Sequence, residues 1–215
     1  MINYFSTGDY MENEIVNQTR VAFEFIEKLY LETSYLIKEI EGILYDEQEK
    51  FIIGRPAGYQ ISVKTSSGLE TNNVKLWLFR KFGVFFVPEE ETKIVGGQTF
   101  TVMRKDLKLI YLRIVLNNSK EIEPKIYSGV IFDIWRKESE KVNKFEHLMG
   151  HIQYKDEKIF MDTENLNYED PAIKIKGRFI KNNLFDMHNS QTLVDKIINP
   201  TLDIYRNLKL NSKPS

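Results

Sequence analysis

The sequence holds 215 residues, of which 42% are hydrophobic and 28% charged, which is typical of a folded protein and excludes a disordered one. It contains no cysteine, which excludes disulfides, thiolate nucleophiles and cysteine-based zinc or iron–sulfur sites. No stretch of about 18 uninterrupted apolar residues is present, and the first residues lack the pattern of a secretory signal. We therefore expect a cytoplasmic protein that does not span a membrane.

The net charge of −1 conceals an uneven distribution of charge along the chain. Residues 1–50 carry 11 Asp or Glu and 4 Lys or Arg, whereas residues 51–215 carry 20 and 26. Either the two parts neutralise each other within one fold, or the basic part binds an anionic partner and the acidic part shields it.

The clearest predicted element is a long amphipathic helix over residues 12–47, at the end of an N-terminal segment 1–47. Apolar residues recur every seven positions, and a second apolar stripe runs beside them. At 1.5 Å per residue, about 32 residues would span roughly 48 Å, which exceeds the width of a small domain. Either this helix bends or breaks near Thr33 and packs wholly on its own sheet, or part of it meets a second chain. The candidate interface residues are Val16, Phe23, Tyr30, Ile37 and Leu44.

A turn follows this helix. Pro56 and Gly58 occupy the second and fourth positions of a type I turn, ahead of an alternating strand over 59–65. The turn explains the glycines without a ligand. The alternative is that Arg55 binds an anion from a rigid loop.

The remaining chain predicts many strands and a last helix. Residues 68–82 form a helix, 84–87 a strand, 89–91 an acidic solvated loop and 92–102 a hairpin. Strands follow at 107–116, 124–135 and 172–180, residues 146–155 end as a strand, and 163–171 form a loop. A helix over 190–209 is capped by Asn189 or Ser190 and kinked at Pro200, within a segment 186–210.

This order predicts one α+β domain over 1–215. Its sheet core, residues 48–185, is mostly antiparallel, is flanked by the N-terminal and C-terminal helices, and carries helices on one face.

Asp133 interrupts an apolar strand. If side chains alternate strictly along this strand, Asp133 lies on the same face as Ile131 and Trp135. A buried carboxylate needs a partner or a metal. With Gln153 and Lys155 on a following strand, it would match a Mg²⁺-dependent nuclease or phosphodiesterase, in which the carboxylate holds the metal and the lysine polarises water or phosphate. The alternative is an Asp133 near a sheet edge, paired with Lys or Arg.

The histidines give a weaker signal. His147 and His151 would share one face of a helix, as a metal site needs, but would lie roughly 13 Å apart on a strand. We therefore predict no metal site and no cofactor, apart from Mg²⁺ if the chain is a nuclease.

The basic strand is the strongest binding signal outside the long helix. Its cationic residues alternate with apolar ones, so they line one face, with one more cation just beyond. Such a face could bind phosphates of a nucleic acid, or could use lysine against edge-to-edge aggregation. The residues are Lys174, Lys176, Arg178 and Lys181.

Three functions remain in order of preference. The first is a cytosolic, non-catalytic interaction protein, an accessory or regulatory subunit that assembles through the long helix with a protein partner or with itself. The second is the metal-dependent nuclease, and the third is a nucleic-acid-binding module. The first rests on the helix pattern and on the lack of a strong catalytic motif.

Overall fold

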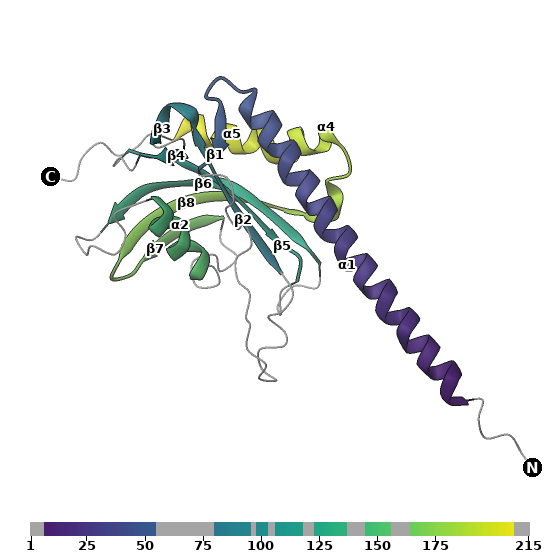
Figure 1. Cartoon of the computed structure of the whole chain (residues 1–215). Coiled ribbons are helices and arrows are strands. Elements are labelled where there is room, and N and C mark those ends of the chain that lie inside the picture. Colours follow the sequence, from purple (N-terminus) through teal and green to yellow (C-terminus); the bar gives the residue numbers. More distant parts are fainter. Residues whose placement is uncertain are drawn as a thin grey trace, which may run out of the picture. The chain divides into compact units, whose positions relative to one another are not determined.

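The computed structural model describes residues 7–54, 80–95, 98–102, 106–117, 123–136, 145–155 and 164–208. It confirms an α+β fold (Figure 1). The helices are α1 (Thr7–Tyr45), α2 (Phe145–Tyr154), α4 (Ser190–Leu193) and α5 (Asn199–Asn207). The strands are β1 (Phe51–Ile53), β2 (Lys81–Pro88), β3 (Thr92–Val95), β4 (Gln98–Thr101), β5 (Leu109–Val115), β6 (Lys125–Arg136), β7 (Asn165–Glu169) and β8 (Ile173–Asn183).

The chain separates into two compact units, Met1–Ile40 and Glu41–Ser215. The first unit contains most of α1, and the second contains both sheets and the other helices. The predicted turn at Arg55, the strand at 59–65 and most of the helix predicted at 68–82 lie outside the described residues.

The second unit is built on a six-stranded antiparallel sheet with the order β1-β2-β5-β6-β8-β7. Each of its described pairs is antiparallel, which confirms the predicted sheet type. Strands β3 and β4 form a separate hairpin, as predicted. The loop predicted over 163–171 is wrong, because Leu166 and Tyr168 belong to β7, which pairs along the edge of β8.

Helices cover both faces of the large sheet, so the prediction of helices on one face is wrong (Figure 1). One face carries Phe85, Tyr111 and Phe179, which form one buried cluster with four side chains of α2. On the other face, Thr201 of α5 donates a buried hydrogen bond to Ser128 of β6 at 2.9 Å. The apolar α2 residues are Phe145, Leu148, Met149 and Ile152.

The core on the α2 face is aromatic and closely packed. The rings of Phe85 and Tyr111 stack with centroids 4.4 Å apart, and Phe179 meets Tyr111 edge-on at 6.4 Å. Gly129 lies between Tyr111 and Phe179 in the strand register. A Cβ there would lie 2.0 Å from the Arg178 carbonyl oxygen, so only glycine lets β6 and β8 approach at this point.

Three local predictions are corrected by the described residues. Lys81 and Phe82 begin strand β2 rather than ending a helix. The segment predicted to end as a strand, residues 146–155, instead lies in helix α2 as far as Tyr154. Glu89–Glu91 form a short 3₁₀ helix in which Glu91 is buried, so this segment is not a wholly solvated loop.

The C-terminal helix follows the prediction closely. The Asn189 side chain accepts a hydrogen bond from the Thr192 backbone N–H at 2.8 Å, which makes Asn189 the cap. The predicted disturbance at Pro200 takes the form of a π-helical segment over Val194–Ile198, after which Pro200 stands at the start of α5. A proline is tolerated there because the first turn of a helix needs no N–H donor.

Helix α1 is unbroken over 39 residues, which corresponds to about 58 Å. The break near Thr33, which was one of the two alternatives for this helix, does not occur. Instead the Thr33 hydroxyl donates to the Leu29 carbonyl at 2.8 Å within the helix. Within the described parts of the chain, no helix is both long enough and apolar enough to cross a membrane.

Candidate functional site

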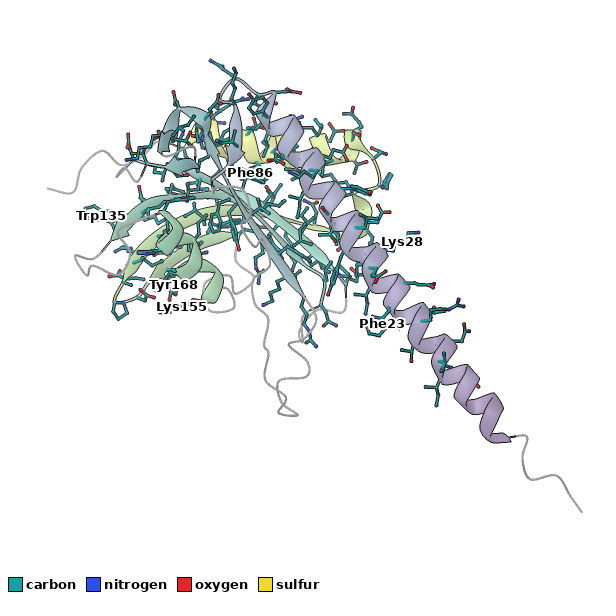
Figure 2. The ribbon with its side chains drawn as sticks, viewed as in Figure 1. Phe23, Lys28, Phe86, Trp135, Lys155 and Tyr168 are labelled. Atoms are coloured by element: carbon teal, nitrogen blue, oxygen red, sulfur yellow. The ribbon has the colours of Figure 1, made fainter. Side chains whose placement is uncertain are left out.

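Residues 14–30 of α1 present an apolar stripe to solvent. Ile15, Val16 and Phe23 are 60%, 63% and 61% exposed, although each belongs to the stripe that the heptad pattern predicts. In Figure 2, the Phe23 and Lys28 side chains leave α1 on different sides, as an amphipathic helix requires. We call the following residues the α1 apolar surface: Ile15, Val16, Ala22, Phe23, Ile26, Leu29 and Tyr30, all exposed or partly exposed.

The same stripe is buried at the other end of the helix. Ile37 and Leu44 occupy the same heptad position as Val16 and Phe23, but are only 3% and 1% exposed. Tyr30 stands between the two groups and is partly exposed. The five predicted interface residues therefore divide into two that are exposed, one at the boundary and two that are buried.

Local polar contacts link side chains along the exposed part of α1. Gln18 donates to Glu14 at 3.0 Å, and Arg20 donates to Asn17 at 2.9 Å. Arg20 also lies 3.9 Å from Glu24, with both side chains mostly exposed. Such contacts stabilise a helix by only a few tenths of a kcal/mol each.

Asp133 is held in a β-bulge on β6. The pairing of β6 with β8 shifts between Phe132 and Trp135, and Asp133 takes a φ of 49°. The extra residue reverses the alternation, so Trp135 pairs with Lys174 and leaves the face of Ile131. The predicted common face of Asp133, Ile131 and Trp135 is therefore wrong.

The Asp133 carboxylate binds a lysine instead of standing unpaired. Lys176 of β8 donates to its Oδ2 at 2.8 Å. The sequence analysis gave pairing of Asp133 with Lys or Arg as the alternative to a metal site, and this pairing is observed. That alternative also placed Asp133 near a sheet edge, whereas β6 is an inner strand.

The other two residues of the predicted nuclease motif do not lie on a strand next to Asp133. Gln153 belongs to helix α2, and Lys155 follows directly after it. Lys155 donates to Asp170 at 2.7 Å, so the lysine has a different carboxylate partner. Among the described residues, no group of three or more His, Asp or Glu side chains is arranged to hold a metal ion.

Asp170 is the centre of a polar cluster that the sequence analysis missed. Its Oδ2 accepts hydrogen bonds from His151 at 2.7 Å, Lys155 at 2.7 Å and Tyr168 at 2.8 Å. Its Oδ1 accepts from the backbone N–H groups of Ala172 and Ile173 at 2.7 and 2.9 Å. Figure 2 shows Lys155 and Tyr168 at this place, where the end of α2 meets β7.

The cluster keeps Asp170 ionised. Burial raises the pKa of the carboxyl, but hydrogen bonds from Lys155, from the two backbone N–H groups and from His151 outweigh burial and hold the pKa far below its usual range. The hydrogen bond to Asp170 in turn raises the pKa of Lys155. Burial and then the Asp170 hydrogen bond raise the pKa of Tyr168.

This arrangement favours a structural role for the cluster. Five donors occupy the two oxygens of Asp170, which leaves little room for a metal or a substrate. Because Asp170 is an ionised acceptor, Nε2 of His151 carries the shared proton. The cluster ties the last turn of α2 to the tight turn between β7 and β8.

The basic strand is only partly available to an anion. Lys174 lies 3.0 Å from Glu169, and Lys176 is bonded to Asp133, so each of these cations has a carboxylate neighbour. Lys181 lies on the opposite face of the sheet, with its ammonium 5.6 Å from the centre of the Tyr127 ring. Arg178 is exposed. The structure therefore brings the four predicted cations onto one strand but not into one binding site.

No protein-family model matches this chain, and comparisons with curated proteins and with solved structures likewise give no match.

Proposed function

We propose that this protein is a non-catalytic interaction protein, an accessory or regulatory subunit that assembles through the α1 apolar surface. The observation that carries the proposal is the exposure of Ile15, Val16 and Phe23 on a helix whose later turns bury the same stripe. Exposed apolar side chains that lie together, rather than singly, are typical of protein–protein contact sites.

The composition of this part of α1 supports a missing partner. The residues over 14–32 include several β-branched and aromatic side chains, which are weaker helix formers than Ala, Leu or Lys. A helix of this kind gains most of its stability from packing an apolar face. Local polar contacts such as those of Arg20 and Glu14 are too weak to replace that packing. A protein that covers the α1 apolar surface would provide it.

The two other functions have less support in the geometry. The nuclease would need Asp133 and Lys155 at one site, but each is bonded to another partner. The nucleic-acid module would need unpaired cations, but Lys174 and Lys176 are next to carboxylates. A cytoplasmic location belongs to this proposal and rests on the sequence alone.

The test is the recovery of a stoichiometric protein partner by the tagged full chain from its native cells. We expect Phe23→Glu to abolish recovery, because it places a charge in the centre of the α1 apolar surface. Lys28→Glu is the matched control, since it also adds an acidic residue to an exposed site of the same helix, and it should leave recovery unchanged. Two outcomes would contradict the proposal. One is equal recovery of the partner by both variants, and the other is a wild-type chain that binds neither a partner protein nor a second copy of itself.

A further inference from the structure

We infer that one end of the large sheet, on the face that also carries α2, binds a small ligand with several phosphate groups. The inference goes beyond the proposed function and does not involve the α1 apolar surface. The site is formed by four basic residues from four neighbouring strands, which we call the sheet-end cations: Lys81 of β2, Arg113 of β5, Lys125 of β6 and Lys181 of β8.

The strand register brings these four residues onto one face. Arg113 pairs with Tyr127, and Tyr127 pairs with Lys181. Lys81 and Lys125 both pair with the same residue of β5, two positions beyond Arg113. Residues two positions apart on a strand share a face, so each sheet-end cation is the diagonal neighbour of the next, at about 7–8 Å.

The surroundings of these cations differ from those of the basic residues on the other face of β8. There, Lys174 lies 3.0 Å from Glu169, and Lys176 is bonded to Asp133. The two rows of paired residues at the sheet end contain four basic residues and no acidic one. The other members of these rows are Gly83, Val115, Tyr127 and Asn183. The register therefore gathers positive charge here, and an anion is the ligand that complements it.

Arg113 and Lys181 lie next to one aromatic ring. The Arg113 guanidinium is 5.0 Å from the centre of the Tyr127 ring, and the Lys181 ammonium is 5.6 Å from it. Arg113 is only 3% exposed, whereas Lys181 is exposed. Lys181 can therefore contact a ligand directly, while Arg113 adds positive charge beneath it. A charge below the surface attracts an anion more strongly than the same charge in bulk water.

The other two cations lie at intermediate depth. Lys81 is partly exposed, and the Lys125 side chain is 16% exposed. Lys125 donates to Glu123 at 3.0 Å and also to Asn183. The other three sheet-end cations likewise make contacts within the chain. An ammonium has three donors and a guanidinium has five, so these groups can bind a phosphate in addition to such contacts.

The spacing of the cations favours a ligand with more than one phosphate group. Four strands at about 4.8 Å place Lys81 and Lys181 roughly 14 Å apart across the sheet, so one phosphate would contact only part of the set. A chain of phosphates offers oxygens along this line. Hydrogen bonds between lysine and phosphate are charge-assisted and stronger than those between neutral groups.

Calorimetric titration of the full chain with tripolyphosphate at fixed ionic strength tests the inference. We expect one saturable site, and much weaker binding of inorganic phosphate. Lys81→Gln and Lys181→Gln should each weaken tripolyphosphate binding about tenfold, which corresponds to one charge-assisted hydrogen bond. Arg178→Gln is the matched control, because it removes an equal charge from an exposed site on the opposite face of β8, and it should change the affinity little.

Three results would overturn the inference. They are a folded wild type without saturable binding of tripolyphosphate, equal weakening by Arg178→Gln and Lys181→Gln, and tighter binding of a single-stranded oligonucleotide that the lysine variants lose. The last result would assign the cations to nucleic acid. Phe23→Glu should leave tripolyphosphate binding unchanged, so failure of this inference is distinct from failure of the proposed function.

Discussion

The sheet unit and the exposed part of α1 differ in whether their apolar side chains are buried and their charged side chains are paired. In the sheet unit, most of the described large apolar residues are buried, with Ile94, Trp135 and Phe185 as exposed exceptions. Charged residues such as Asp133 and Asp170 have partners close by. In α1 the reverse holds, since Phe23 and Val16 face solvent. The comparison teaches that, among the described residues, exposed large apolar side chains are concentrated on α1.

The largest expected effect compares two phenylalanines. Phe86 is 0% exposed in the sheet, whereas Phe23 is 61% exposed on α1. We expect Phe86→Ala to lower the free energy of unfolding by about 3–5 kcal/mol, because it leaves a cavity. Phe23→Ala should change it by less than about 0.5 kcal/mol in dilute monomer. Urea unfolding measures both, and equal losses would remove the distinction between the two regions.

The next effect concerns the Asp170 cluster. Asp170→Asn keeps the shape of the side chain but removes the charge that Lys155 and His151 share. We expect a loss of about 1–3 kcal/mol in the free energy of unfolding at neutral pH, because partly buried donors lose a charged acceptor. Glu169→Gln, one residue earlier and exposed, is the control and should have little effect. An unchanged Asp170→Asn variant would mean that the cluster does not tie α2 to the sheet.

The same cluster predicts a pH dependence. The pKa of Asp170 is lowered by folding, so its contribution is present above the unfolded-state value of about 3.9 and is lost as pH falls below that value. The difference in stability between wild type and Asp170→Asn should therefore be greatest near neutral pH and shrink under acid conditions. Urea unfolding from pH 7 to pH 3 measures it, and a constant difference would contradict the assignment.

The smallest expected effect tests the bulge on β6. Asp133 has a φ of 49° and a bond to Lys176, so Asp133→Ala loses the bond and keeps the backbone strain. Asp133→Gly loses the same bond but relieves the strain. We expect the glycine variant to be more stable than the alanine variant by about 1 kcal/mol. Equal stabilities of the two variants would show that the positive φ at residue 133 causes no strain in a residue with a side chain.

Much of the fold could be predicted from local patterns. The alternation in β8 and the seven-residue repeat in α1 are long and regular, and both predictions are confirmed. Helix α2 was missed although Phe145, Leu148 and Ile152 follow helical spacing, because Gly150 and the short length favoured a strand. Strand β7 was missed because Asn residues obscure the alternation of Leu166 and Tyr168.

The candidate sites were harder to predict from the sequence, because their geometry depends on tertiary structure. The bulge at Asp133 changes the face of Trp135, and strict alternation gives no sign of it. The Asp170 cluster joins residues up to 19 positions apart, through an Asp-Pro turn whose partners lie on a helix. The α1 apolar surface was predictable as a stripe, but only the structure shows which part of that stripe is exposed.

The packing of β1 against the last turn of α5 has a consequence for synthesis of the protein. Phe51 meets the Tyr205 ring edge-on at 4.9 Å, and Arg206 donates to Glu49 at 2.7 Å. The start of the sheet therefore cannot be completed until residues 205 and 206 have been synthesised. Helix α1 is synthesised before every strand of the sheet, so its apolar residues are uncovered while residues 51–206 are being added. Neighbouring ribosomes on one message would hold several such helices at high local concentration, so the assembly proposed above would be able to begin before any single chain has finished folding.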